Sequence, residues 1–569
     1  MPKPTASGPW PAGLPRHLSV PATGLADNLD VSARRYPGKM ALHFHGRDMP
    51  YAELARRVRR LATHLASVGG VRPGDRVLLM MQNSPAFVCA CYAILRLGAV
   101  VVPVNPMNRT EELRWIVSDS GARVACLAQD LWAQLAPLRD EGLLDHAVLA
   151  RYGADLPDLP VPDVAPGLDA PRLAIDGPGL TWLEDIVAAE GRDATTDAAR
   201  QAQDVRDAGA CGEDLAVLAY TSGTTGQPKG CMLSHRAVQA AAACLLAWNR
   251  WTPDAAALAT APFFHVTGMV GSMHVPLLCG AAIVLLPRWD RAAAAQLIAQ
   301  QQVSHWTNVP TMVSDLLALP DLQGDALASL SYIGGGGTAM PAAVAERLHA
   351  LTGLEYQEGW GLTEVAGAIH LNPPGAERRQ CLGVPAFGVD TRVVAVDGPG
   401  GEVPTGESGE LVTRCPSLFS GYWGNPEATQ LAFLTLHGER YFCTGDIGCV
   451  DAEGYFHLAD RLKRMINASG YKVWPAEVES LLYRHPAVQE ACVVGSPDAH
   501  RGETVKAFVV LRSGLAEPPS AQALVDWARE HMAAYKVPRL IAFVDALPRS
   551  GTGKILWRQL QEAERSSGG

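Results

Sequence analysis

The sequence predicts an α/β protein in which mixed, mostly parallel sheets are covered by helices, with a small α+β domain after them. Three observations predict it. Strand-like and helix-like segments alternate over residues 51–128 and again over 215–333. Strand-like segments follow one another after about residue 380, as in a meander or a small barrel-like part. After about residue 460 both kinds of segment return, in a stretch long enough to bury a core of its own.

The first alternation begins with apolar residues at helical spacing over residues 51–65. It continues with a strand at 76–81, a helix at 85–97, a strand at 100–104, a helix at 110–120 and a strand at 123–128. An apolar stretch over 87–104 is interrupted by a charge, a glycine and a proline, so we expect a buried helix and strand rather than a membrane span. Residues 151–207 are rich in Pro, Asp and Gly and predict a surface excursion with only short elements.

The later elements follow the same rules. Ser234 is expected to cap the N-terminus of a helix over 234–247. We expect further strands at 215–220, 281–286, 303–308, 329–333, 391–396 and 410–414. The C-terminal pattern predicts helices at 475–484 and 521–533, and strands at 488–494, 505–511 and 540–544. The change of pattern predicts two domains, residues 1–459 and residues 460–569.

Composition and charge exclude several classes of function. The chain has 58 acidic and 48 basic side chains, a net charge of −10 and a pI of about 5.9. This balance argues against a nucleic-acid-binding protein that relies on a basic face. The 12 cysteines include no CxxC pair, so we expect buried thiols in a reducing compartment and no zinc framework. No signal-like apolar segment is visible, and we expect a cytoplasmic protein.

A loop rich in glycine and hydroxyl side chains follows the strand at 215–220. Over residues 221–230 it reads Thr-Ser-Gly-Thr-Thr-Gly-Gln-Pro-Lys-Gly. The glycines allow a tight turn that directs backbone N–H groups toward an anion, and Lys229 adds a positive charge, which suits a polyphosphate. Pro228 stands where a Walker A loop requires glycine. A polar turn without a ligand is the alternative that the loop alone leaves open.

Three more stretches carry candidate ligand groups. Residues 356–364 read Tyr-Gln-Glu-Gly-Trp-Gly-Leu-Thr-Glu, where Trp360 can stack on a flat base and Glu364 can hold Mg²⁺. The glycine run over 334–337 predicts a flexible loop or a wall where a ligand meets backbone. Asp446 can accept hydrogen bonds from a ribose diol. A buried tryptophan and a turn carboxylate are the alternatives for Trp360 and Asp446.

The order of these motifs resembles the superfamily of acyl- and aryl-CoA synthetases, peptide-synthetase adenylation domains and beetle luciferases. Two later stretches strengthen the resemblance: residues 460–479, which begin Asp-Arg-Leu-Lys-Arg, and residues 548–555, Pro-Arg-Ser-Gly-Thr-Gly-Lys-Ile. It spans residues 41–554. It implies two half-reactions, in which a carboxylate attacks the α-phosphate of ATP to give an acyl-adenylate and pyrophosphate, and a thiol, usually of coenzyme A, then displaces AMP.

The resemblance also implies roles for single residues. Glu364 and Thr221 would hold Mg²⁺, and the catalytic residues would be Lys554, Thr221, Glu364 and His265. Trp360, where the family usually has Tyr, would stack on adenine. The implied ATP- and AMP-binding residues are Thr221, Ser222, Gly223, Thr224, Thr225, Gly226, Lys229, Gly336, Gly337, Thr338, Glu358, Gly359, Trp360, Gly361, Thr363, Asp446, Arg461 and Lys554. Within that set, Thr363 would bind the α-phosphate, Asp446 and Arg461 the ribose, and Lys554 the reacting carboxylate and phosphate oxygens.

The acyl and thiol sites are implied in the same way. The acyl pocket would be lined by His265, Val266, Thr267, Gly268, Met269, Gly334 and Gly335, with a gap at Gly268. A histidine beside aromatic residues is otherwise most often part of the core. No acidic residue occurs over 263–270, so the substrate acid is expected to lack an α-amino group, whose buried charge would be unpaired. Lys463 would be the hinge of a mobile C-terminal domain, whose coenzyme A channel would be formed by Ser469, Gly470, Tyr471 and Lys472.

These motifs predict an AMP-forming acyl-CoA synthetase for an apolar carboxylic acid, with ATP, Mg²⁺ and coenzyme A as its cofactors. The Glu-Gly-Trp sequence at 358–360 and the Asp-Arg-Leu-Lys sequence at 460–463 most resemble those of medium- and long-chain fatty acid enzymes, so the resemblance implies such an acid. An alicyclic or aromatic acid, an enzyme that loads a carrier protein, and a non-catalytic nucleotide sensor are the alternatives. The presence of both Lys229 and Lys554 argues against the sensor. We expect no nucleic-acid partner and no integral membrane segment, while a homodimer is left open.

Overall fold

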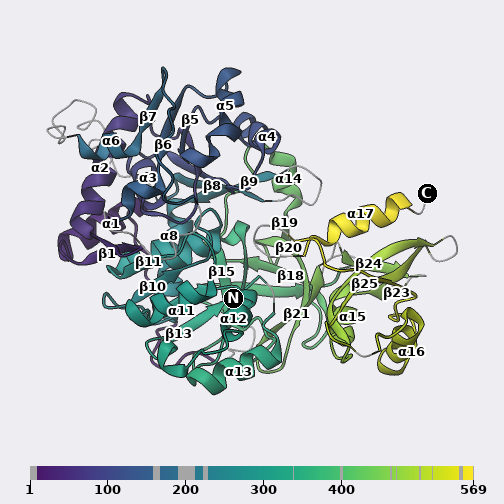
Figure 1. The fold of residues 1–569 in the computed structure, drawn as a ribbon. Helices are drawn as coiled ribbons and strands as arrows, with labels where there is room; N and C mark the ends of the chain where they lie inside the picture. The colour runs from purple at the N-terminus through teal and green to yellow at the C-terminus, as the bar shows by residue number, and fades with distance from the viewer. Residues whose placement is uncertain are drawn as a thin grey trace. The chain divides into compact units, whose positions relative to one another are not determined.

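The computed structural model describes residues 9–157, 167–189, 212–221, 228–337, 339–396, 401–461, 464–468, 471–498, 502–515, 517–549 and 555–567. The chain divides into two compact units, each of which contains sheets and helices (Figure 1). The large unit comprises Pro9–Asp390 and Arg414–Phe433, and the described residues of the small unit come from Thr391–Thr413 and Leu434–Gly569. Both sides of the predicted 459/460 boundary belong to the small unit, and that boundary stays a prediction.

A seven-stranded sheet in the large unit has the order β7-β6-β5-β3-β4-β8-β9. All neighbouring strands are parallel except β8 and β9, which are antiparallel. The strands are β3 (Arg76–Met80), β4 (Val100–Pro103), β5 (Val124–Ala128), β6 (His146–Ala150), β7 (Leu180–Trp182), β8 (Leu215–Thr221) and β9 (Lys229–Ser234). The four strands predicted here are confirmed to within one residue at each end. The β7 strand, inside the predicted surface excursion, joins the edge of the sheet.

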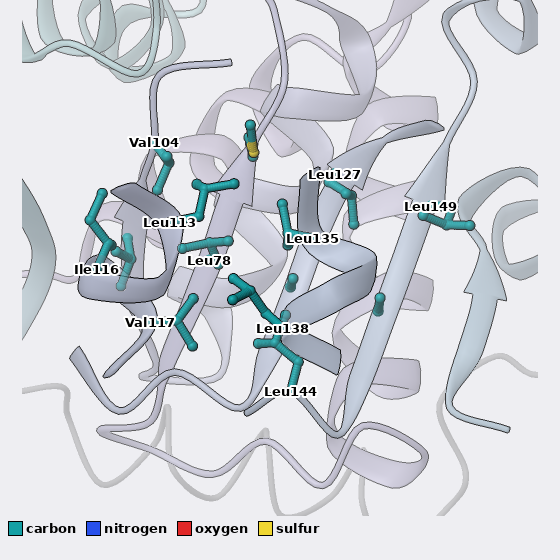
Figure 2. Packing of buried hydrophobic residues seen from close by; sticks show 14 of the residues in the cluster. Leu78, Val104, Leu113, Ile116, Val117, Leu127, Leu135, Leu138, Leu144 and Leu149 are labelled. Carbon is teal, nitrogen blue, oxygen red and sulfur yellow. The ribbon is translucent and has the colours of Figure 1, made fainter. Parts of the chain in front are cut away.

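Helices cover this sheet because their apolar faces pack against it. Figure 2 shows leucine and valine side chains of two helices meeting leucines of the strands. The helices of this region are α2 (Tyr51–Ser67), α3 (Pro85–Arg96), α4 (Thr110–Ser120), α5 (Trp132–Asp140) and α6 (Leu183–Ala188). Burying each such side chain contributes about 1.5–3 kcal/mol. The helix α3 is buried along all but its last residue and leads into the buried β4, as predicted.

A nine-stranded sheet, also in the large unit, has the order β16-β15-β14-β13-β12-β10-β11-β1-β2. Its central pairs are parallel, and the pairs at both edges are antiparallel. The strands are β1 (Met40–Phe44), β2 (Arg47–Pro50), β10 (Ala256–Ala259), β11 (Ala282–Leu285), β12 (His305–Asn308), β13 (Tyr332–Gly335), β14 (Gln357–Leu362), β15 (Gly367–Leu371) and β16 (Val384–Pro385). The β13 strand begins three residues later than predicted.

The other helices of the large unit pack near this sheet or follow it in sequence. They are α1 (Leu25–Arg35), α8 (His235–Trp248), α9 (Val266–Met269), the π-helical turn η3 (Val270–His274), α10 (Val275–Cys279), α11 (Arg291–Gln300), α12 (Pro310–Leu317), α13 (Ala342–Thr352) and α14 (Pro426–Leu431). The predicted cap of α8 is confirmed, because Ser234 Oγ accepts a hydrogen bond from the backbone N–H of Ala237 at 3.2 Å. Among the described residues, no helix is long and apolar enough to cross a membrane.

The small unit contains two five-stranded sheets. The first holds the strands predicted after residue 380: β17 (Asp390–Val394), β18 (Gly409–Arg414), β19 (Phe433–Leu436), β20 (Glu439–Val450) and β21 (Phe456–Arg461). The second holds β22 (Ile466–Ala468), β23 (Tyr471–Val473), β24 (Val488–Asp498), β25 (Gly502–Leu511) and β26 (Leu540–Phe543), with α15 (Pro475–Leu482), α16 (Ala521–His531) and α17 (Trp557–Ser567). A cluster of buried apolar residues over 466–524 gives this second sheet a core of its own, as predicted.

Candidate functional site

The polar loop predicted to bind phosphate connects two antiparallel strands, β8 and β9. These strands pair as far as Thr221 and Lys229, which lie opposite each other in register. Thr221 Oγ1 also donates a hydrogen bond to the carbonyl oxygen of Lys229, at 3.5 Å. The hairpin therefore brings together the first and last of the predicted phosphate ligands. The five between them, Ser222, Gly223, Thr224, Thr225 and Gly226, lie outside the described residues.

Hydrogen bonds with the helix α4 support this hairpin. Tyr220 donates its hydroxyl to Asp119 Oδ2 at 2.6 Å, at the end of β8. Trp115 Nε1 donates to the carbonyl oxygen of Pro228 at 3.1 Å, just before β9. Trp423 Nε1 donates to the carbonyl oxygen of Asp119 at 3.0 Å. Each end of the loop is thus fixed by a hydrogen bond that does not depend on a ligand.

Glu364, the predicted magnesium ligand, lies in the short 3-10 turn η5 (Thr363–Val365) that follows β14. Its side chain is half-buried, and its Oε1 atom accepts a hydrogen bond from the hydroxyl of Tyr422 at 3.0 Å. The buried thiol of Cys231 lies within hydrogen-bonding reach of both Glu364 and Thr221. The two predicted metal ligands are therefore both near one cysteine, although they are far apart in the sequence.

The charges at this site suit an anionic ligand that carries a metal ion. Lys229 Nζ lies over the ring of Tyr422, 5.2 Å from the ring centroid. Burial and the negative charge of Glu364 raise the pKa of the Cys231 thiol well above its usual value, so the thiol stays protonated. The oxygen donors that remain, a carboxylate and a hydroxyl, are of the kind that Mg²⁺ prefers. These residues fit Mg²⁺ and a polyphosphate.

Sequence reasoning missed Tyr422 and Cys231. Cys231 lies two residues after Lys229, and alternation along a strand would have placed both on one face. The strand β9 was not predicted, however, because its six residues lead directly into the helix α8. Tyr422 lies 58 residues after Glu364, where it forms an isolated β-bridge with Cys231, and no local pattern in the sequence links Tyr422 with Glu364.

Trp360, predicted to stack on adenine, is 7% exposed and lies in β14. Its ring meets the buried ring of His370 edge-on, with 4.9 Å between the ring centroids. Burial lowers the pKa of His370 to about 3, so this imidazole is neutral. A Cβ atom at Gly361 would overlap the carbonyl oxygen of Gly367, so the glycine allows β14 and β15 to approach each other. The stacking role of Trp360 stays a prediction.

Glu358, in the predicted nucleotide-binding set, is 8% exposed at the other end of β14. Its Oε1 accepts the backbone N–H of Gln380 at 2.8 Å, and its Oε2 accepts the N–H of Met340 at 3.4 Å. Burial raises the pKa of this carboxyl to about 7. Both oxygen atoms of Glu358 thus bind the backbone of other loops.

The predicted glycine wall begins inside β13, whose last two residues are Gly334 and Gly335. A Cβ atom at Gly335 would overlap the carbonyl oxygen of Asn308, and one at Gly336 would overlap that of Gly359. At Gly334 it would press on Gln357. These glycines are therefore required by the close approach of neighbouring strands, and Gly337 has a positive φ of 93°. Thr338 lies outside the described residues.

The predicted acyl pocket surrounds the start of α9. His265 is the N-cap of this helix, and its Nδ1 accepts the backbone N–H of Thr267 at 3.3 Å. Val266 and Met269 are buried, at 3% and 1% exposed. The gap predicted at Gly268 is wrong, because a Cβ atom there would overlap the carbonyl oxygens of Ala261 and Pro262. The missing side chain lets the helix pack on the preceding loop.

The remaining predicted site residues belong to the small unit. Asp446 and Arg461 lie opposite each other in the β20–β21 register, which brings the two predicted ribose ligands together. Asp446 is 1% exposed, and its backbone N–H donates to Thr444 Oγ1 at 3.1 Å. Tyr471 and Lys472 lie on β23. The residues Lys463, Ser469, Gly470 and Lys554 lie outside the described residues.

Comparison with known proteins agrees with this geometry. Residues 29–423 match the model of the AMP-binding enzyme family, and residues 477–554 match that of the AMP-binding enzyme C-terminal domain. A long-chain-fatty-acid–CoA ligase of Bacillus subtilis (strain 168) is 32% identical over 98% of both chains. A feruloyl-CoA synthase of an Amycolatopsis species is 36% identical over 92% of this chain and 96% of its own.

The fold is shared as well. The crystal structure of ATP-bound MatB from Rhodopseudomonas palustris superposes with a TM-score of 0.81 at 27% identity, over 95% of this chain and 100% of that chain. The family match covers more than half of this chain, and it includes β8, β9, η5 and Tyr422. The chain therefore belongs to the AMP-binding enzyme family, as an AMP-forming acid–CoA ligase that uses ATP, Mg²⁺ and coenzyme A.

Proposed function

We propose that this ligase activates an apolar carboxylic acid, with a medium- or long-chain fatty acid as its first candidate. The observation that carries this proposal is the uncharged, buried side of α9, where Val266 and Met269 follow His265. An apolar wall of this kind favours alkyl groups by about 0.8 kcal/mol for each methylene that it buries. The similarity to a long-chain-fatty-acid–CoA ligase over almost the whole chain supports the same class of acid.

An aromatic acid is the second candidate. The feruloyl-CoA synthase is 36% identical to this chain, against 32% for the fatty acid ligase. Met269 is an unbranched side chain that can adapt to either an alkyl chain or a ring. An alicyclic acid would require the same apolar surface. Transfer to the thiol of a carrier protein, in place of free coenzyme A, is the remaining alternative and differs only in the second half-reaction.

In the proposed adenylation step, the protein positions the reactants and neutralises their charge. Lys229 would bind the phosphate chain of ATP, and Glu364 and Thr221 would hold the metal ion. Mg²⁺ supplies the positive charge that offsets the phosphate oxygens. His265 would orient the carboxylate of the acid, since its Nδ1 already accepts a backbone N–H and its ring is held in one orientation.

The sharpest test of the substrate is AMP release in the presence of coenzyme A over a panel of acids. The panel runs from acetate to palmitate and includes benzoate, ferulate and cyclohexanecarboxylate. We expect kcat/KM to rise steeply with alkyl chain length. The same assay with a phosphopantetheinylated carrier protein separates the two acceptors. A preference for acetate would contradict the apolar-acid proposal, and a preference for ferulate would establish the second candidate.

Lys554 is the subject of a separate prediction. If this lysine offsets the charge that develops at the α-phosphate, Lys554→Ala should lower ATP–pyrophosphate exchange by about three orders of magnitude or more. Thioester formation from a preformed acyl-adenylate should be largely spared, because it does not build that charge. Both half-reactions are measured on the same preparation. Equal losses in the two would count against this role, which, like that of the hinge Lys463 and of residues 469–472, is a proposal.

A further inference from the structure

We propose that Tyr422 is a positioning residue of the adenylation site, where its hydroxyl orients Glu364 and its ring positions Lys229. The inference rests on the roles proposed above for those two residues. Tyr422 touches both of them: its hydroxyl lies 3.0 Å from Glu364 Oε1, and its ring centroid lies 5.2 Å from Lys229 Nζ. One side chain thereby connects the proposed metal ligand with the proposed phosphate ligand.

The backbone around Tyr422 is fixed without a ligand. Residues 419–423 lie beside β9, where three backbone hydrogen bonds of 2.8–3.0 Å connect the two segments. On the other side, the N–H of Phe419 donates to the carbonyl oxygen of Glu364 at 2.7 Å. The N–H of Tyr422 itself donates to Thr429 Oγ1 at 2.9 Å. The tyrosine is therefore held between the hairpin and the turn that carries Glu364.

The hydroxyl of Tyr422 acts as a donor to the Glu364 carboxylate, at 3.0 Å from its Oε1 atom. A donor on Oε1 fixes the rotation of the Glu364 carboxylate. Partners of this kind typically change metal affinity by about 10- to 100-fold when they are removed.

The ring of Tyr422 acts separately from its hydroxyl. The face of an aromatic ring attracts an ammonium group and adds no negative charge beside it. The ring contact therefore restricts the position of Lys229. Because the two contacts use different parts of the side chain, Tyr422→Phe removes one of them and Tyr422→Leu removes both.

The chain offers a matched control. Tyr220 is also half-buried, and its hydroxyl also donates to a carboxylate, Asp119, at 2.6 Å. Asp119 belongs to α4 and is not a proposed ligand. Tyr220→Phe thus removes one tyrosine–carboxylate hydrogen bond beside the same hairpin without touching Glu364.

The experiment measures Mn²⁺ binding to the ATP complex by electron paramagnetic resonance, with no acid present, and ATP binding without metal. We expect Tyr422→Phe to weaken Mn²⁺ binding about tenfold and to raise the Mg²⁺ concentration for half-maximal ATP–pyrophosphate exchange by the same factor. Its affinity for metal-free ATP should stay within about twofold of the parent. Tyr422→Leu should weaken metal-free ATP binding as well. Tyr220→Phe, which releases one end of the loop, should not weaken Mn²⁺ binding without weakening metal-free ATP binding by the same factor.

Unchanged Mn²⁺ binding in Tyr422→Phe overturns the inference. Glu364→Gln is measured alongside to show where a failure lies. If Glu364→Gln weakens Mn²⁺ binding and Tyr422→Phe does not, the inference fails and the proposed role of Glu364 stands. If neither variant weakens it, the proposed role of Glu364 fails too. Should Tyr422→Leu not fold, the phenylalanine variant decides alone, because it keeps the ring.

Discussion

Two glutamates of one motif, Glu358 in β14 and Glu364 in the turn η5 after it, have different surroundings. Glu358 is 8% exposed and is bound by the backbone N–H groups of Gln380 and Met340. Glu364, six residues later, is half-buried and receives the hydroxyl of Tyr422. Both belong to one motif in the sequence, and the resemblance assigned both to the active site.

The difference between them lies in their donors. Backbone N–H groups belong to fixed loops, and leaving two of them buried without an acceptor costs about 1–3 kcal/mol each. Glu358 therefore contributes chiefly to the stability of the large unit. The Tyr422 hydroxyl donates to Oε1 of Glu364, and the partial exposure of Glu364 leaves room for a cation. The donors and the exposure of the two side chains therefore favour Glu364 over Glu358 as the proposed metal ligand.

The largest expected effect is on adenylation. Glu364→Gln removes the charge of the proposed metal ligand and should lower ATP–pyrophosphate exchange by about 100-fold or more, with the melting temperature nearly unchanged. Glu358→Gln should lower exchange per folded molecule far less, because its carboxylate binds backbone. Exchange and thermal unfolding are measured for both variants. A greater loss of exchange in Glu358→Gln would break the comparison.

The next effect concerns stability and pH. The pKa of Glu358 is about 7 in the folded protein, against 4.5 for an unperturbed glutamate. The protonated form of Glu358 therefore stabilises the folded state, and this contribution is complete below pH 4.5. This contribution is lost as the pH rises through about 7, with a slope of at most about 1.4 kcal/mol per pH unit. Glu358→Gln removes this dependence. The free energy of unfolding is measured in urea at pH 5, 6, 7 and 8. Between the lowest and the highest pH, that of the variant should rise by about 1–3 kcal/mol relative to that of the parent.

That gain must appear between pH 5 and pH 7.5 and level off above it. Parallel stability curves for the parent and Glu358→Gln would mean that the two backbone N–H groups keep the carboxylate ionised throughout. In that case the two donors of Glu358 would outweigh the effect of its burial on the carboxyl pKa.

The smallest effect is expected at Trp360, between the two glutamates. Trp360→Tyr keeps an aromatic face against His370 and should change the KM for ATP by less than about threefold. Trp360→Ala removes that face and should raise this KM about tenfold or more. Steady-state kinetics with varied ATP test both variants. An unchanged KM in Trp360→Ala would show that the prediction of adenine stacking is wrong.

Much of the fold could be predicted because local signals agreed with it. Apolar periodicity identified α2, α3 and α4 closely, and a single capping serine marked the start of α8. Parallel strands separated by helices gave the correct class for the large unit. The short strands β9, β14 and β15 carry weaker signals, since glycines and polar residues interrupt them.

The site was harder to predict, for physical reasons. The motif order pointed to Thr221, Lys229 and Glu364, which the structure brings together around Cys231. The gap expected at Gly268 depended on the direction of an absent Cβ, and that direction is occupied by carbonyl groups that only the folded chain brings there. The contact between Tyr422 and Glu364 is equally invisible in the sequence, because it joins segments from distant parts of the chain.

The segment Arg414–Phe433 has a consequence for exchanging parts between relatives. The large unit is discontinuous, because the chain leaves it after Asp390 and returns for these twenty residues before the small unit continues. A chimera spliced at residue 390 would take Tyr422 and its neighbours from the other parent, and would set a foreign loop against the native β9 and Glu364. With a splice after residue 433, both residues of each of these contacts come from the same parent protein.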